Sequence, residues 1–228
     1  MNTVLSFTLA ASLALGSGVH AQAMELIGTG SGPFFVKVTS LKEACFKSTT
    51  RQQFDFSCGS AAIATLLTYH YNYPMTEQAV FNEMFARGDQ VKIRKEGFSL
   101  LDMKIFLEAH QFKADGFELP LVKLLESGLP AIVLIAEKGY HHFVVIKGMR
   151  DGRILVGDPS SGTRAVSQAH FASIWVNQLL FVIHNQKKQA KFNQHVDWQA
   201  APRAPLSAGL GVDGMSGLAF SKLGPGDF

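Results

Sequence analysis

The sequence predicts an α+β fold in which a mainly helical first half is followed by an antiparallel β-sheet. The run from Gly59 to Tyr71 has small residues on one side and larger apolar residues on the other, a pattern typical of a helix packed closely against a sheet. The second half changes to short, β-branched, apolar runs separated by turn residues. Helices that precede a sheet, instead of alternating with its strands, favour the α+β class.

The composition describes an ordinary globular chain of 228 residues, of which 47% are hydrophobic and 17% are charged. This apolar content supports one substantial core and excludes disorder, coiled coil and collagen. The formal net charge is +3 and no block of like charges is present, which argues against nucleic acid as a partner. Two cysteines are too few for a disulfide scaffold. The sequence has neither a CxxC pair nor an HExxH motif, so a zinc site is not predicted and no cofactor is expected.

Residues 1–21 have the pattern of a signal peptide. An uncharged apolar segment from Val4 to Leu15 is followed by small residues, so cleavage is expected after Ala21 or Ala23. The apolar segment is too short to span a bilayer, and we therefore expect export without stable membrane insertion. A buried N-terminal strand or helix is the alternative interpretation.

Residues 22–39 are expected to form a linker with a short strand, and residues 40–190 to form the functional domain. The central helix lies near the start of this domain. Capping signals predict three more helices, which begin at Thr76, Ser99 and Pro120 and run through Ala86, His110 and Ser127. The first half of the domain is thus mainly helical.

The second half of the domain is expected to form the sheet. Its predicted strands cover residues 131–135, 142–146, 153–156 and 179–183. Asp151-Gly152 is a hairpin signal between the second and third of these strands. Residues 191–228 are rich in Gly and Pro and lack a steady apolar period, which predicts a flexible or surface-wrapping tail.

Three polar residues are spaced for nucleophilic catalysis. Cys58 lies where a loop meets the central helix, and the positive end of the helix dipole there predicts a thiol of low pKa. His142 begins a strand and Asp158 ends the next one. A nucleophile, a base and an orienting carboxylate in this order form the Cys-His-Asp arrangement of papain-like chemistry. Gln52 and Gln53 are two candidate donors for an oxyanion hole.

Other interpretations of these residues remain open at this point. Cys58 could form a disulfide with Cys45, and His141 competes with His142 as the base because strand neighbours face opposite sides. Strand alternation also constrains Asp158: a two-residue turn with regular pairing would point it away from His142. The triad therefore predicts an odd loop, such as residues 150–152, or a bulge in the hairpin.

Three segments resemble one known family, the C39 cysteine peptidases, which are papain-like leader peptidases best known from bacteriocin exporters. Gln52 to Ala62 (QQFDFSCGSAA) resembles its cysteine signature, His142 to Val145 its histidine motif, and Asp158-Pro159 with Gly162 its Asp-Pro…Gly motif. The resemblance covers roughly residues 40 to 185 and implies a papain-like fold. It also implies a nucleophile, a base, an orienting carboxylate and an oxyanion donor at Cys58, His142, Asp158 and Gln52 respectively.

The sequence departs from the exporter-type members of that family. It has neither predicted membrane spans nor a GxxxxGK[ST] loop, so no nucleotide is expected, and Ser57 stands where an Asp often precedes the cysteine. A standalone, exported chain with a Gly-rich tail resembles the C39-like peptidase of functional-amyloid systems. That resemblance implies a periplasmic location and a substrate among exported proteins, either amyloid subunits or their secretion machinery. An inactive peptide-binding module and a transglutaminase-like acyltransferase are the alternatives.

Overall fold

The computed structural model describes residues 24–26, 34–36, 40–137 and 139–202. The predicted signal peptide and the last part of the predicted tail, residues 203–228, lie outside the described residues. The chain divides into two units, residues 1–40 and 41–228. In the first unit, β1 (Met24–Leu26) pairs antiparallel with β2 (Phe34–Val36). None of the described helices has the length and apolar character needed to cross a membrane.

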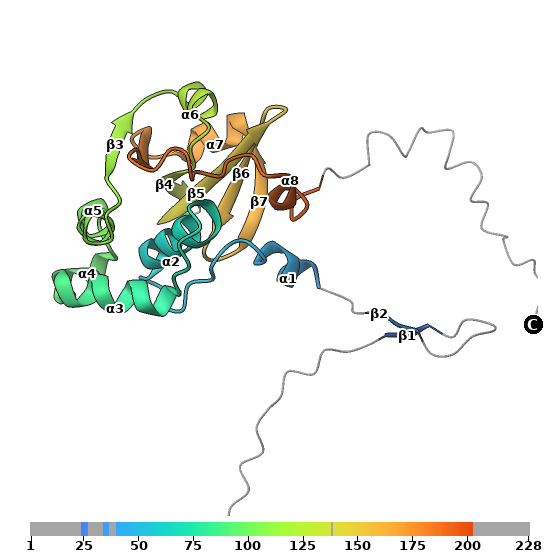
Figure 1. The fold of residues 1–228 in the computed structure, drawn as a ribbon, viewed down its shortest axis with the longest axis horizontal. Helices are drawn as coiled ribbons and strands as arrows, with labels where there is room; N and C mark the ends of the chain where they lie inside the picture. The colour runs from blue at the N-terminus through green and yellow to red at the C-terminus, as the bar shows by residue number, and fades with distance from the viewer. Residues whose placement is uncertain (1–23, 27–33, 37–39, 138, 203–228) are drawn as a thin grey trace, which may run out of the picture. The chain divides into compact units, whose positions relative to one another are not determined.

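A group of helices precedes the main sheet, as the sequence predicts. They are α1 (Leu41–Cys45), α2 (Cys58–Thr65), α3 (Glu77–Arg87), α4 (Gln90–Glu96) and α5 (Leu100–Ala109), shown in Figure 1. The predicted caps of α3 and α5 are confirmed: Thr76 accepts a hydrogen bond from a first-turn amide, and Ser99 forms a capping box with Asp102. The helix α4 was not predicted, although its cap, Asp89, is a recognisable signal.

The central helix predicted over 59–71 is α2 together with a π-helical turn, η1 (Leu66–His70). Every residue of α2 is buried. Small side chains allow this close packing: a Cβ atom at Gly59 would lie 2.8 Å from the Met103 side chain and 3.0 Å from Cβ of Phe98. A larger residue at Gly59 would push apart α2 and the region of α5 that covers it.

The main sheet is antiparallel and has six strands in the order β3-β8-β4-β5-β6-β7. The strands are β3 (Ala114–Glu118), β4 (Ala131–Glu137), β5 (Tyr140–Arg150), β6 (Arg153–Asp158), β7 (Gly162–Ser167) and β8 (Leu179–Ile183). The predicted α+β class is confirmed. The two edge strands, β3 and β7, were not predicted because they carry polar residues instead of an apolar run.

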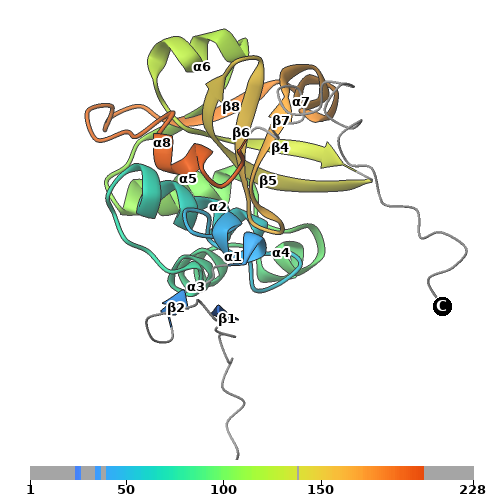
Figure 2. The same ribbon diagram turned by 90° about the vertical axis from the view of Figure 1, so that its right-hand side faces the viewer.

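An apolar layer covers each face of this sheet. On one face, Phe143 and Val145 pack with buried residues of α2 to α5. On the other, Val144 and Ile146 pack with buried residues of α6 (Leu121–Ser127) and α7 (Gln168–Ile174). Figures 1 and 2 show α6 and α7 on the side of the sheet opposite to α2, α3 and α4. Alternate residues of β5 therefore serve two separate layers.

The hairpin between β5 and β6 decides which way Asp158 points. Its turn has two residues, Asp151 and Gly152, both with positive φ, so the predicted odd loop is wrong. The register instead shifts between Ile146 and Gly148, which makes Lys147 an extra, bulged residue. With this bulge Val145 pairs with Gly157, and Asp158 falls on the same face of the sheet as His142. The bulge that the triad allowed is therefore present.

Residues 191–202, which belong to the predicted flexible or surface-wrapping tail, pack on the domain. A short helix, α8 (His195–Trp198), buries Asp197 and Trp198. The guanidinium groups of Arg150 and Arg153 lie 4.6 and 5.3 Å from the centre of the Trp198 ring. The buried part of the chain thus extends beyond residue 190. The sequence does not show this because the segment has no helical or strand period and is held by single side chains such as Trp198.

Candidate active site

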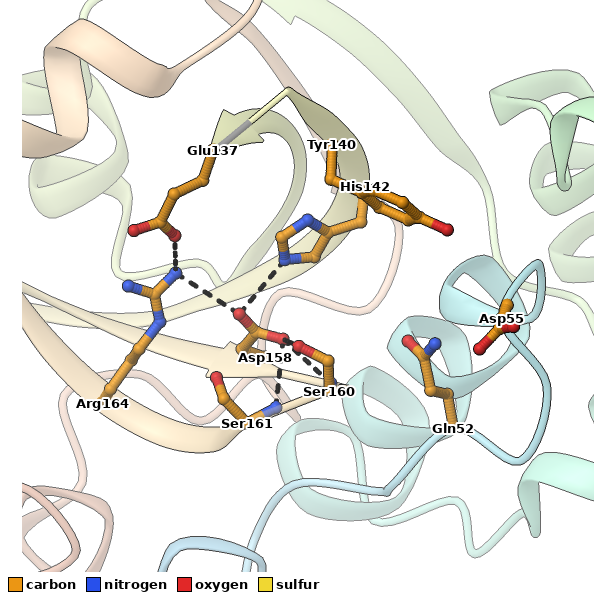
Figure 3. A pocket seen from close by; sticks show the side chains of 9 residues that line it. All are labelled: Gln52, Asp55, Glu137, Tyr140, His142, Asp158, Ser160, Ser161 and Arg164. Atoms are coloured by element: carbon orange, nitrogen blue, oxygen red, sulfur yellow. Dashed lines mark hydrogen bonds and ion pairs between the residues drawn. The ribbon is translucent and has the colours of Figure 1, made fainter.

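His142 and Asp158 form a hydrogen-bonded pair where β5 begins and β6 ends (Figure 3). His142 Nε2 lies 3.1 Å from Asp158 Oδ2, and the two side chains are 14% and 3% exposed. Because an ionised carboxylate only accepts hydrogen bonds, Nε2 carries the proton and Nδ1 keeps its lone pair. Nδ1 of His142 is therefore the ring nitrogen that can accept a proton from a substrate or a nucleophile.

Further donors hold Asp158 in its charged form. The Ser160 amide and hydroxyl donate to Oδ1 at 2.9 and 2.6 Å, and the Arg164 guanidinium donates to Oδ2 at 3.3 Å. Burial raises the pKa of Asp158, but the hydrogen bonds from His142 and Ser160 outweigh burial and hold this pKa well below its usual range. Asp158 is therefore ionised near neutral pH and orients the imidazole.

Arg164 on β7 was missed by the sequence analysis. Its Nη2 bridges two carboxylates, Glu137 at 2.7 Å and Asp158 at 3.3 Å. Burial raises the pKa of Glu137, but its bonds to Arg164 more than offset burial and leave the pKa lowered. Arg164 pairs with Val156, two residues before Asp158, so it lies on the same face of the sheet. The pairing of β6 with β7 brings Arg164 close to Asp158, and no local sequence pattern indicates it.

Cys58 is the first residue of α2 and is 9% exposed. Burial is the largest influence on its thiol and raises its pKa, while backbone amides at Phe143 and Gly59 lower it and the charge of Asp158 raises it further. The net pKa lies above the usual value for cysteine. The prediction of a low-pKa thiol is therefore wrong, because desolvation outweighs the amides at the start of the helix.

Two cavities adjoin at this site. One, of about 470 Å³, is lined by Gln52, Asp55, Glu137, Tyr140, His142, Asp158, Ser160, Ser161 and Arg164. The other, of about 480 Å³, is lined by Asp55, Phe56, Cys58, Arg94, Lys95, Glu96, Gly97, Gly139, Tyr140 and His141. Asp55 and Tyr140 belong to both linings. The thiol and the imidazole thus open on neighbouring spaces, and the Phe143 amide of β5 lowers the pKa of the thiol.

Of the two candidate glutamines, Gln52 lines the cavity of His142, whereas Gln53 is exposed and lines neither cavity. The Gln52 amide donates to the Pro159 carbonyl at 3.0 Å, which ties this loop to the turn after Asp158. The Gln52 side chain donates to the Phe54 carbonyl at 3.1 Å. The structure therefore brings Gln52, and not Gln53, to the predicted site.

The competing residues do not form the pairs that the alternative interpretations require. Both cysteines are free, and Cys45 Sγ lies 3.8 Å from the Ala200 carbonyl oxygen, so the structure contains no disulfide between Cys45 and Cys58. His141 lines the cavity of Cys58, but the carboxylate of Asp158 bonds to His142. Within the described ranges, no group of three or more His, Cys, Asp or Glu side chains is arranged to hold a metal ion.

The model of the peptidase C39 family matches residues 47–187. The chain belongs to the peptidase C39 family. The resemblance inferred from the cysteine, histidine and aspartate motifs is thereby confirmed. This chain is 38% identical over 157 residues to the "Probable functional amyloid protease FapD" of Pseudomonas aeruginosa, and the match covers 69% of each protein. It is 35% identical over 179 residues to the protein of the same name from Pseudomonas fluorescens, covering 78% of this chain and 76% of the relative.

Solved structures include similar peptidase domains. The peptidase domain of Streptococcus ComA is 20% identical with a TM-score of 0.49, covering 60% of the C39 chain and 97% of that structure. A double glycine motif protease from an AMS/PCAT transporter, in complex with the leader peptide, is 21% identical with a TM-score of 0.49. The match covers 60% of this chain and 91% of that structure.

Proposed function

We propose that the chain is an exported cysteine peptidase that cleaves an exported protein of a functional-amyloid system. Membership of the C39 family and the similarity to FapD proteins support the class of enzyme and the system. The observation that carries the proposal is the hydrogen bond between His142 and Asp158, in a cavity that adjoins the cavity of Cys58. Export rests on the pattern of residues 1–21, and its expected destination is the periplasm.

In this proposal Cys58 is the nucleophile and His142 is the base. His142 Nδ1 removes the thiol proton as Sγ attacks the carbonyl carbon of the scissile peptide bond. The C–S bond forms while the carbonyl π electrons move to oxygen, which gives a tetrahedral oxyanion. Asp158 stabilises the imidazolium that results. The side-chain amide of Gln52 and the backbone amide of Cys58 are the donors for the oxyanion.

The second half of the reaction releases the products. The oxyanion collapses, the C–N bond breaks, and His142 donates its proton to the leaving amine, which leaves a thioester on Cys58. His142 then removes a proton from water as the water oxygen attacks the thioester carbonyl carbon. The C–S bond breaks and His142 returns the proton to the sulfur, which gives the carboxylic acid and the free thiol. In a transglutaminase-like reaction an amine would take the place of this water.

The raised pKa of Cys58 sets when the proton moves. A thiol of this kind is neutral near pH 7, so the thiolate forms during the attack and not beforehand. The thiol and His142 line adjoining cavities, and the proposal requires them to meet in the complex with substrate. Catalytic hydrogen bonds commonly shorten only when substrate is bound.

Cleavage assays with the purified mature protein test this proposal. The substrates are amyloid subunits and their secretion partners, and the assay compares the wild type with Cys58→Ala and with the matched control Cys45→Ala. We expect cleavage by the wild type and by Cys45→Ala, and none by Cys58→Ala, because the nucleophile is lost. Binding without cleavage by the wild type would identify a peptide-binding module, and incorporation of a labelled amine would identify an acyltransferase.

The two glutamines provide a second test. Gln52→Ala should lower kcat about 10²- to 10³-fold if its amide binds the oxyanion. Gln53→Ala is the matched control and should retain activity, because Gln53 is exposed outside both cavities. A loss of rate in Gln53→Ala alone would place the oxyanion hole one residue along the loop.

A further inference from the structure

We propose that Lys147 is a positioning residue, which fixes the β5 bulge and thereby brings Asp158 to the face of His142. The inference rests on the proposed function, in which His142 and Asp158 act together. It concerns neither the nucleophile nor the substrate. Without a bulge at Lys147, the two-residue turn would give regular pairing and would direct Asp158 to the opposite face.

The side chain of Lys147 is fully buried and joins β5 to two other parts of the chain. Its Nζ lies 2.9 Å from Asp197 Oδ1, and it donates to the carbonyl and hydroxyl oxygens of Ser48 at 2.7 and 2.6 Å. The exposed fractions of the Lys147 and Asp197 side chains are 0% and 1%. The bulge is thus tied to the segment before α2 and to α8 through one ammonium group.

The aliphatic part of Lys147 covers the strand that carries Asp158. A Cβ atom at Gly157 would lie 2.9 Å from Lys147 Cδ and 2.9 Å from Thr49 Oγ1. Glycine at this position leaves room for the lysine stem to cross β6 one residue before Asp158. The stem of Lys147 therefore lies over Gly157, the residue before Asp158.

The backbone of the bulge is held from the outer side by Asn193. The last pair between β4 and β5 is Ala131 with Ile146, so the bulge extends beyond β4. There the Asn193 amide donates to the Lys147 carbonyl at 2.9 Å, and the Asn193 side chain bonds both backbone groups of Met149 at 2.8 and 2.9 Å. Asn193 thus takes the place of β4 beside this part of β5.

A buried ion pair is an inefficient way to stabilise a core, because desolvation of both charges opposes their attraction. Burial lowers the pKa of Lys147, and the charge of Asp197 opposes that effect. The pair occurs at the residue where the strand register changes. The directional bonds of this pair favour the bulged register over the regular one. An apolar side chain would pack in either register and would not discriminate between them.

The test replaces the pair by apolar residues of similar volume in Lys147→Met/Asp197→Leu, a change that buried ion pairs commonly tolerate. We expect the variant to fold, to keep KM within about twofold, and to lose about 10- to 100-fold in kcat, as small misplacements of reacting groups do. Leu107→Ala is the control, because it removes a buried side chain of α5 and leaves the bonds of Lys147 in place. It should lower stability without lowering kcat.

A second readout does not depend on peptidase activity. Nitrogen-15 NMR of the His142 ring should show protonated Nε2 in the wild type and in Leu107→Ala, and a mixture of tautomers in the double variant. Wild-type kcat and an unchanged tautomer in a folded double variant would overturn the inference, as would an equal loss of kcat in Leu107→Ala. If the wild type cleaves no substrate while the tautomer still changes, the proposed function fails and the positioning role stands.

Discussion

Two side-chain pairs, each with an aspartate, begin on the same strand, β5, and differ in their access to solvent. His142 pairs with Asp158 in the lining of a cavity of about 470 Å³. Lys147, five residues further along the chain, pairs with Asp197 where neither side chain reaches solvent. A group that must gain and release protons needs a cavity that admits substrate or water. A charged group that fixes a backbone register forms stronger hydrogen bonds when solvent is excluded and its partner is always present.

The two pairs also differ in how their partners are held. Asp158 has Ser160 and Arg164 as additional donors, so loss of one partner leaves its charge compensated. Lys147 depends on Asp197 for its counter-charge, and the other atoms that it bonds among the described residues are neutral oxygens. The same substitution, aspartate to asparagine, should therefore affect mainly the rate at the first pair and mainly the stability at the second.

Asp158→Asn should have the largest effect, a loss of about 10⁴ in kcat. The amide oxygen of the introduced asparagine would keep the place of Oδ1, which accepts from Ser160 and Ser161. The NH₂ group would then face the Nε2 hydrogen of His142 and favour the tautomer with its proton on Nδ1, which cannot accept the thiol proton. Steady-state kinetics measures the loss, and NMR of the His142 ring measures the tautomer. Unchanged turnover would remove Asp158 from the mechanism.

The sequence predicted the first pair and not the second, for a physical reason. Cys58, His142 and Asp158 each stand at the end of a helix or strand, where local patterns are informative. Lys147 and Asp197 are brought together by the fold alone, and Lys147 in an apolar strand looks like a surface residue. The pKa of Cys58 was predicted in the wrong direction for the same reason, since the start of a helix is a local feature and burial is a tertiary one.

Asp197→Asn should have the next largest effect, a loss of about 3–5 kcal/mol in the free energy of unfolding, because it leaves a buried ammonium without a counter-charge. Urea denaturation measures this loss. Glu126→Gln is the control: it removes the exposed pair with Lys123 and should change stability by less than about 1 kcal/mol. The loss should largely disappear in Lys147→Met/Asp197→Leu. An Asp197→Asn variant as stable as the control would show that the buried pair contributes little to the free energy of unfolding.

Acid should weaken the first pair gradually, with a smaller effect than either substitution. The folded pKa of Asp158 is depressed relative to about 3.9 for an unfolded aspartate, so its contribution to stability is complete above that value and is lost as pH falls through the folded pKa. Asp158→Asn has no such group. The difference in unfolding free energy between wild type and Asp158→Asn, measured by urea denaturation, should therefore be constant from pH 7 to about 5 and narrow below about pH 4. A difference that stays constant down to about pH 2.5 would mean that the hydrogen bonds of Asp158 do not favour its charged form.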